Sequence, residues 1–499
     1  PKRIAFDFSG WRKVKIRGEG AVFLFHTDIL PFHLDRCHEI LIEGITIDYE
    51  RTGYSEGEIV ELSGKRMVLR IDRKEYPYRV FHGELYFEEE GAYHPLYYGC
   101  LEMDRRRNAP VYQGRDISFN RPYPSSYGAV FREAGENLVE VTLTEDQQFP
   151  ETSREGNRMI LRHHLRTHPC FYITGSEGIT LRDITIYHCT GMAVISQFTK
   201  DITIERVCLV RHPQKDRIFT ATADGFHFVY AGGKIHIKNC VLENQLDDPV
   251  NIHGIYGRIH KVTSKREVIV ELVEGMQKGV LLGTAGDYFA VIDNRTMLEQ
   301  EHAVITEITW MNSDYQRIVF AEDMENLTPG FVVENQSWVP DVLIEGCTFR
   351  NNRARGLLLT SAGDVLVRDN TFETPGAAIL IEGDSNYWFE SGATRHIVIE
   401  GNRFHHCAYV SAWGKAPIQV SPSALVWEKD RRYHQYLEVR GNVFQCCDDR
   451  LVNAVNLKKL VFLDNKIERT TVFEPIKGQA LELDGVLEVE TDINKEQQI

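Results

Sequence analysis

The chain has 499 residues, of which 42% are hydrophobic, 26% charged and 10% aromatic, as is typical of a folded protein with a large core. It has no apolar run of roughly 18 residues or more, so no membrane-spanning helix is predicted. The formal net charge of −15 argues against nucleic acid as a partner, and it favours a neutral over a strongly anionic polymer as substrate.

A short repeat recurs along the chain, in which apolar and polar residues alternate and the strand turns at Gly, Asn or Asp. The copies, the one at 202–209 being the loosest, are ILIEGITI (40–47), ITLRDITI (179–186), ITIERVCL (202–209), IHIKNCVL (235–242), VLIEGCTF (342–349), VLVRDNTF (365–372), IVIEGNRF (397–404), LEVRGNVF (437–444) and LVFLDNKI (460–467). Three successive pairs of copies start 23 residues apart, at 179 and 202, 342 and 365, and 437 and 460. Units of this length that stack strand on strand form a solenoid, and the frame and helical segment of leucine-rich repeats are missing. We therefore predict an all-β, right-handed parallel β-helix.

Two long gaps interrupt this repeat, 139 residues between the copies at 40 and 179 and 107 residues between those at 235 and 342. Both gaps contain hairpin-like alternation, as in EIVELSGKRMVLRID (58–72), and predict small antiparallel barrels or sandwiches. The predicted division assigns 1–52, 171–255 and 338–499 to the β-helix, the last segment with a solvated tail. It assigns 53–170 and 256–337 to two inserted β domains.

The ten cysteines form no CxxC pair, and several occupy the repeat itself, as in IKNC (237–240). They are interpreted as small buried side chains of the core rather than as zinc ligands or redox centres.

Each unit also contains a second strand, and its copies align as GFHFV (225–229), PVNIH (249–253), GLLLT (356–360) and AAILIE (377–382). The residues just before these strands are Asp224, then Asp247 and Asp248, then Arg355. Because neighbouring strands lie about 4.8 Å apart, these corner residues should meet on one outer wall of the solenoid.

Three crowded carboxylates suit glycoside hydrolysis, which needs one protonated and one ionised carboxyl group at the bond that is broken. Crowding helps, because carboxylates that repel each other cannot all ionise and one pKa rises. One proton donor and two acids that hold a water favour inversion of configuration. A calcium site or simple Asx-type turns are the alternative interpretation of the same residues.

The surroundings of the acids are typical of a sugar site, where polar groups meet sugar hydroxyls and aromatic rings meet the apolar face. The candidate substrate-binding residues are His227, Asn251, His253, Arg355, Glu382, Asn386, Trp388 and Glu390. Four of them come from the loop IEGDSNYWFESG (381–392).

At these motifs the sequence resembles glycoside hydrolase family 110, the α-1,3-galactosidases that remove the terminal galactose of blood-group B and related glycans. The resemblance runs from GAVFLFHTDILPFHLDRC (20–37) through TADGFHF, NQLDDPVNIHG and EGDSNYWFESG to the late coils. It implies a β-helix with two inserted β-barrels, an inverting mechanism, no metal or other cofactor, and Asp224, Asp247 and Asp248 as catalytic acids.

A more distant likeness to the polygalacturonases implies that Asp247 donates the proton while Asp224 and Asp248 hold the water. The Gly-His-Gly turn and Arg-Ile-Lys strand of those enzymes do not follow the Asp pair here, which favours neutral galactose over a uronic acid.

The expected function is therefore an exo-acting inverting hydrolase that releases terminal α-1,3-linked galactose from blood-group B-like or linear α-galactosyl glycans. The alternatives are a β-helix hydrolase or lyase acting on an acidic galactan-type polysaccharide, and a non-catalytic carbohydrate-binding solenoid. The expected partner is a glycan with terminal α-galactose, and a homodimer through the exposed flank of the solenoid stays open. An extracellular or periplasmic location is expected from where such glycans occur, although no signal peptide is visible.

Overall fold

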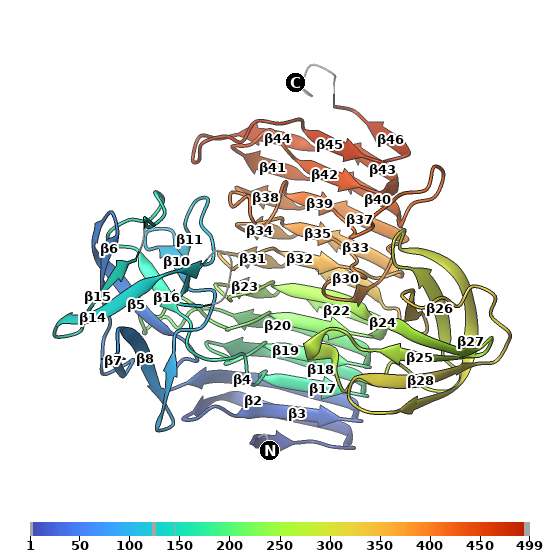
Figure 1. Cartoon of the computed structure of the whole chain (residues 1–499), viewed down its shortest axis with the longest axis horizontal. Coiled ribbons are helices and arrows are strands. Elements are labelled where there is room, and N and C mark those ends of the chain that lie inside the picture. The colour runs from blue at the N-terminus through green and yellow to red at the C-terminus, as the bar shows by residue number, and fades with distance from the viewer. Residues whose placement is uncertain (1–2, 122–125, 145, 494–499) are drawn as a thin grey trace.

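The computed structural model describes residues 3–121, 126–144 and 146–493, and nearly all of its regular structure is β-strand (Figure 1). Parallel strands stack coil upon coil from the N-terminal to the C-terminal end, and two antiparallel domains flank the stack on opposite sides (Figure 1). The predicted all-β parallel β-helix with two insertions is confirmed. Among the described residues no helix is long and apolar enough to cross a membrane.

One long sheet of the solenoid contains all copies of the sequence repeat, stacked in register. Ile40 pairs with Ile179, Ile179 with Ile202, and Val342 with Val365, so that equivalent repeat positions lie side by side. The strands are β2 (Arg12–Phe25), β4 (His38–Tyr49), β18 (Glu177–Ile186), β20 (Lys200–Leu209), β22 (Gly232–Lys238), β23 (Val241–Glu243), β30 (Asp341–Glu345), β31 (Thr348–Arg350), β33 (Asp364–Arg368), β34 (Thr371–Glu373), β37 (His396–Glu400), β38 (Arg403–His405), β40 (His434–Arg440), β41 (Val443–Cys446), β43 (Leu457–Leu463), β44 (Lys466–Arg469) and β46 (Glu488–Thr491).

The Gly, Asn or Asp of the repeat marks a bend at which the backbone is left-handed. The φ angle is 71° at Gly44, 53° at Asn239 and 55° at Asp369. Glycine adopts this conformation without steric cost, and Asn and Asp tolerate it better than other residues. The composition of the repeat therefore follows from one backbone position.

A ladder of asparagines, buried except for the half-buried Asn465 at its end, runs along this bend in the later coils. The side-chain Oδ1 of Asn370, Asn402, Asn442 and Asn465 accepts a hydrogen bond from the backbone N–H of the residue one coil before, at 2.8–2.9 Å. The first donor in this series is Cys347. Each rung satisfies a backbone group that would otherwise be buried without a partner.

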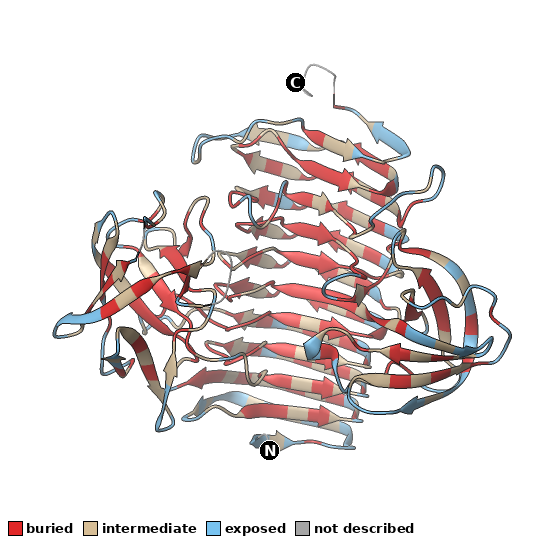
Figure 2. Ribbon diagram, in the orientation of Figure 1, coloured by how far each residue is buried: buried red, intermediate tan, exposed pale blue. Residues whose placement is uncertain are grey.

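The second solenoid sheet contains the aligned second strands. Phe226 pairs with Val250, Phe228 with Ile252, and Val250 in turn with Leu357, and all five side chains are buried in the core, as predicted. Figure 2 shows buried residues on the strands of every coil in the middle of the stack. Its solenoid strands are β1 (Ile4–Asp7), β3 (Leu30–Asp35), β17 (Phe171–Thr174), β19 (Val194–Gln197), β21 (Phe226–Val229), β24 (Val250–Ser264), β32 (Leu357–Leu359), β35 (Ile379–Ile381), β39 (Ile418–Val420), β42 (Val452–Val455) and β45 (Leu481–Asp484).

The first insertion lies between β4 and β17 and has its own core, separate from that of the solenoid. It contains a seven-stranded sheet in the order β11-β10-β16-β5-β6-β15-β14 and a three-stranded sheet β7-β8-β9. The strands are β5 (Ser55–Ser63), β6 (Arg66–Arg70), β7 (Tyr78–Phe81), β8 (Glu84–Glu89), β9 (Ala92–Pro95), β10 (Leu101–Asp104), β11 (Ala109–Pro110), β14 (Ala129–Gly135), β15 (Leu138–Leu143) and β16 (Arg158–Leu161), with a short pair β12 (Ser118–Phe119) and β13 (Ser126–Tyr127) beside them.

The second insertion is a closed antiparallel barrel in which the pairing runs β24-β25-β28-β27-β26-β29 and back to β24. Closure leaves no free sheet edge. Its other strands are β25 (Glu267–Glu271), β26 (Tyr288–Asp293), β27 (Leu298–Trp310), β28 (Tyr315–Phe320) and β29 (Val332–Asn335), and a short 3₁₀ turn η1 (Gly275–Gln277) follows β25. Strand β24 passes unbroken from solenoid to barrel, so the expected boundary at 255/256 falls within one strand.

The cysteines are all free, and eight of the ten are buried, as the sequence predicts for small core side chains. The two partly exposed ones are Cys208 and Cys447.

We predict that Asn402→Ala lowers the free energy of unfolding by about 3 kcal/mol, because two backbone groups of the preceding coil lose buried partners. Asn402 accepts from the N–H of Asn370 and donates from Nδ2 to the carbonyl of Val367. Thermal and urea unfolding measure the effect, and Asn326→Ala, at an exposed position, is the control. Equal stability of the two variants would show that the ladder does not stabilise the solenoid.

Candidate active site

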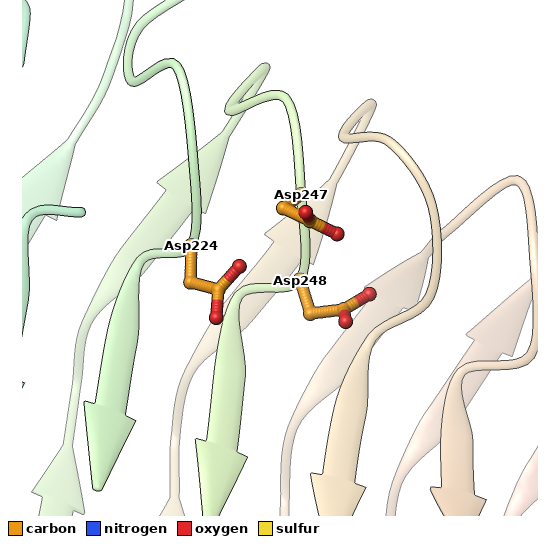
Figure 3. A group of neighbouring side chains, drawn as sticks. All are labelled: Asp224, Asp247 and Asp248. Atoms are coloured by element: carbon orange, nitrogen blue, oxygen red, sulfur yellow. The ribbon is translucent and has the colours of Figure 1, made fainter. Parts of the chain in front are cut away.

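Three aspartates meet where two neighbouring coils turn into the second sheet (Figure 3). Asp224 lies two residues before β21 and Asp248 two residues before β24, and the N–H of Gly225 donates to the carbonyl of Asp248 over 2.9 Å. One side-chain oxygen from each of Asp224, Asp247 and Asp248 lies within 4.8 Å of the others. The expected convergence on one wall of the solenoid is present.

Arginines neutralise this group of acids. Arg355 donates to both oxygens of Asp248, from Nε over 3.2 Å and from Nη2 over 2.7 Å, and its backbone N–H donates to the same carboxylate over 2.9 Å. Asp247 accepts from Nη2 of Arg166 on one oxygen and from Nη1 of Arg353 on the other, at 3.4 Å for the latter. Charges buried together in this way must be paired, because each alone would be strongly destabilising.

The two adjacent aspartates have opposite pKa shifts. Burial disfavours ionisation of Asp247, but Arg166 and Arg353 outweigh it and lower the pKa of this carboxyl to about 2. Burial raises the pKa of Asp248 to about 7 against the pull of Arg355, and the charge of Asp247 adds to the rise. Asp248 is therefore the member of the pair that is more easily protonated in the free protein.

A chain of hydrogen bonds leads away from Asp224 through two histidines. Nδ1 of His227 lies 2.5 Å from Oδ2 of Asp224, Nε2 of His227 lies 2.8 Å from Nε2 of His253, and Nδ1 of His253 lies 2.6 Å from the carbonyl oxygen of Gly254. The carbonyl can only accept, so Nδ1 of His253 carries a proton. Each of the three contacts needs one proton, whereas two neutral imidazoles supply only two.

The third proton lies in the contact between Asp224 and His227, and the raised pKa of His227 favours the imidazolium. Burial opposes its charge, but the hydrogen bond to Asp224 and the charge of that carboxylate raise the pKa of His227. Burial lowers the pKa of His253 to about 3, so this ring stays neutral. This chain of hydrogen bonds thus holds one oxygen of Asp224 against the imidazolium of His227.

Of the expected substrate-binding residues, Asn251, Glu382 and Glu390 lie at this group. Glu390 is 3.5 Å from Nε2 of His253 and interacts with the side chain of Asn251. The Oδ1 of Asn251 is buried and has no hydrogen-bond partner. Burial raises the pKa values of Glu382 and Glu390 to about 7 each, and Arg355 partly counteracts both shifts.

Asn386 and Trp388 are not joined to the acids by any hydrogen bond or ion pair of the described residues. The side-chain amide of Asn386 donates to the carbonyl of Ser423, and the Trp388 ring packs edge-on against Tyr387 with centroids 4.8 Å apart. The carboxylate of Asp384 accepts from the backbone N–H of Trp388 and shapes the loop. In the free protein these two side chains make contacts within the loop and with the segment beside it, and they do not contact the acids.

Sequence reasoning missed Arg166, Arg353 and Asp116. Arg353 lies at the same corner as Arg355, and the spacing of the two in NNRARG (351–356) was the available signal. Asp116 of the first insertion accepts from Nε and Nη2 of Arg353 at 2.8 and 2.6 Å. Arg166 follows β16 outside the repeat, so no register could have placed it beside Asp247.

The three carboxylates are also close enough together to offer ligands to a metal ion. Five of their six oxygens already accept from arginine or histidine side chains, the exception being Oδ1 of Asp224. Calcium takes about six to eight oxygen ligands, and three adjacent guanidinium groups would repel it. The donor set fits a cation poorly.

Two family models match the chain. One, described as "GLAA-B beta-barrel domain I", covers residues 55–158, and the other, "Right handed beta helix region", covers residues 227–470. The first lies in the first insertion, and the second spans solenoid coils and the second insertion and includes Asp247 and Asp248 but not Asp224.

Curated relatives match across the solenoid and both insertions. The chain is 28% identical over 478 residues to "Alpha-1,3-galactosidase B" of Bacteroides thetaiotaomicron, covering 95% of this chain and 77% of the relative. It is 27% identical to "Alpha-1,3-galactosidase A" of Shewanella woodyi, covering 96% and 77%. A solved structure described as "Glycoside hydrolase" aligns over 99% of this chain and 90% of its own with 9% identity and a TM-score of 0.36, a similarity too low to inform function.

We predict that His227 stays imidazolium above its ordinary pKa of about 6.5 and that His253→Ala lowers the pKa of His227, because the acceptor for Nε2–H is lost. The raised pKa means that this contribution to stability is complete at acidic pH and is lost as pH rises through the folded value. Nitrogen NMR of the imidazole rings measures the charge, with His302→Ala, at an exposed ring, as control. A neutral His227 at pH 6 in the wild-type protein would contradict the proton count.

Proposed function

We propose that the protein is an exo-acting, inverting glycoside hydrolase that releases terminal α-1,3-linked galactose from blood-group B-like or linear α-galactosyl glycans. The observation that carries the proposal is the convergence of Asp224, Asp247 and Asp248 from two coils into one charged group. The relatives named alpha-1,3-galactosidase support the bond and the sugar.

In the proposed reaction the Asp247–Asp248 pair carries one proton near neutral pH and gives it to the glycosidic oxygen as the bond breaks. The low pKa of Asp247 in the free protein does not favour the expected assignment of this residue as donor, since two arginines hold it ionised. The pair titrates as a unit, and substrate that reaches Asp247 would have to displace an arginine before this side chain could donate.

Asp224 supplies the base in this scheme. His227 holds its Oδ2, while Oδ1 accepts from no side chain of the described residues and stays available to a water.

The stereochemical proposal comes from the three-acid arrangement and the sequence resemblance rather than from spacing. Inverting enzymes with two acids hold them about 6.5–9.5 Å apart, whereas retaining enzymes hold them about 5–5.5 Å apart. One oxygen of each acid lies within 4.8 Å of the others, so the separation of the carboxyl groups does not by itself favour inversion. In a group of three, the water can lie between two of the acids.

Residues outside the solenoid approach the acid group from two directions, which supports an exo mode because an enclosed site takes the end of a glycan. Arg166 and Asp116 approach from the first insertion, and Glu390 of the short strand β36 (Glu390–Ser391) approaches from the other side. Gln277 of the barrel donates to the carbonyl of Trp388 and thereby holds that second wall. The unpartnered Oδ1 of Asn251 between them is an acceptor for a sugar hydroxyl.

The alternatives fit less well. A lyase for an acidic polysaccharide needs a cation and a free basic side chain beside the uronate, but Arg166, Arg353 and Arg355 are all engaged by carboxylates. A non-catalytic binding solenoid does not require three crowded acids, two of them buried, at one point, a costly arrangement when nothing uses it.

We predict that Asp247→Asn lowers the rate of galactose release from an α-1,3-linked disaccharide by about 10³-fold or more, since the amide can neither carry the proton nor hold the arginines. Circular dichroism should show an unchanged fold. Asp369→Asn, the same chemical change at an exposed position, is the control and should leave the rate unaffected. Turnover of Asp247→Asn at the wild-type rate would remove this residue from the mechanism.

The same assay separates the roles of the two adjacent acids. An aryl α-galactoside with an acidic phenol needs little proton donation, so the donor's Asn variant should recover on this substrate relative to the disaccharide. The pKa order in the free protein predicts the larger recovery for Asp248→Asn. Larger recovery for Asp247→Asn would restore the division of labour expected from the sequence.

For the stereochemistry, proton NMR of the first sugar released should show β-galactose, because water attacks opposite the leaving group. First appearance of the α-anomer would establish retention and would contradict the role proposed for water.

We predict that the protein needs no metal ion. After EDTA treatment and desalting, the rate of galactose release should stay within about twofold of the untreated rate, since arginines occupy the carboxylate oxygens that a cation would need. Loss of activity that Ca²⁺ restores would instead identify the aspartates as a metal site.

A further inference from the structure

A cavity of about 740 Å³ lies at the opposite end of the second-sheet strands from the acids. The barrel contributes Tyr288 and Glu334, the solenoid corner contributes residues such as Thr360, and the segments around Arg395 and Tyr433 contribute the rest. Asp224, Asp247 and Asp248 are not among the lining residues. The volume is in the range of sites for small ligands, about 300–1,000 Å³.

The short strand β36 separates this cavity from the acids. Neighbouring side chains of a strand point to opposite faces. Glu390 accordingly faces His253 and the acid group, at 3.5 Å, while Ser391 lines the cavity. Strand β36 pairs with Gly254 and Ile255 of β24, so the wall is part of a sheet rather than a loose loop.

One polar group deep in the cavity lacks a hydrogen-bond partner. Ser391 is fully buried, and its Oγ makes no hydrogen bond of normal length, although it lies near enough to Glu334 to affect the pKa of that carboxyl. Glu334 is 8% exposed, and burial raises its pKa to about 7 while Arg395 acts in the opposite direction. A buried hydroxyl without a partner costs free energy that a bound polar ligand would recover.

The rim adds unpaired cations and aromatic rings. Arg395 and Lys458 line the cavity, and neither takes part in an ion pair with any described residue. Tyr288, Trp338 and Tyr433 line it as well. Donors, acceptors and aromatic rings at one concave site are what a saccharide uses, because its hydroxyls both donate and accept and its ring carbons pack on aromatic faces.

We propose that this cavity is a second saccharide-binding site, which takes neutral hexose units and carries out no chemistry. Hydroxyls of the sugar would complete the hydrogen bonds of Ser391, Glu334 and Arg395. The site adjoins the acid group at His253, which lines the cavity and ends the hydrogen-bond chain from Asp224, and its existence does not depend on the proposed galactosidase activity.

The test is calorimetric titration of the Asp247→Asn variant, which keeps glycans intact if the enzyme is a hydrolase. The probes are α-1,3-galactobiose, N-acetyllactosamine and, as an anionic comparison, digalacturonate. With Asp247→Asn alone, we expect a neutral sugar to bind at the cavity. Adding Ser391→Ala or Arg395→Ala should weaken that binding at least tenfold, and adding Lys261→Ala, which removes an exposed charge outside the cavity, should not.

Ser391→Ala removes only a hydroxyl, so a folding failure is not expected, and unfolding temperatures check this for every variant. Neutral-sugar binding that is unchanged in both cavity variants, binding of digalacturonate alone, or no binding outside the acid group would each overturn the proposal. Galactose release by Arg395→Ala in the wild-type background should stay within twofold. If the wild-type protein released no galactose, the proposed function would fail, but the titrations would still show whether the cavity binds a neutral sugar.

Discussion

The regular stacking of parallel strands decides which side chains meet in this protein. Because Phe226 pairs with Val250 and Val250 with Leu357, the residues that precede these strands occupy consecutive corners of the same wall. Asp224, Asp248 and Arg355 are brought together by that register alone. Everything proposed about the chemistry depends on it, since a shift of one residue would turn these side chains to the other face.

The charge of the site follows from its burial. Three carboxylates in so small a space repel one another, but Arg166 and Arg353 pair with Asp247, Arg355 pairs with Asp248, and His227 pairs with Asp224. The arginines come from two segments, since Arg353 and Arg355 share one corner of the solenoid and Arg166 follows the last strand of the first insertion. The insertions are therefore part of the site: one supplies charge, and the other braces the wall at β36 and closes a separate cavity behind it.

The repeat made the solenoid predictable to the level of individual strand partners, because a left-handed bend at Gly44, Asn239 or Asp369 leaves its mark in composition. The same register predicted that the aspartates converge. What it could not place were residues outside the repeat, such as Arg166 and Asp116, because loop conformations leave no periodic signal. The loop of Asn386 and Trp388 shows the other limit: residue types suited to sugar binding also suit a loop that is stabilised by Asp384.

The central claim is that carboxylates from two neighbouring coils act on one glycosidic bond. A crystal structure of the Asp247→Asn variant soaked with α-1,3-galactobiose tests it most directly. The account predicts the non-reducing galactose between Asn251 and the acids, with the bridging oxygen about 3 Å from the side chain of residue 247 or 248 and a water beside Asp224. A disaccharide bound only elsewhere, or one whose bridging oxygen lies beyond reach of all three side chains, would contradict the account.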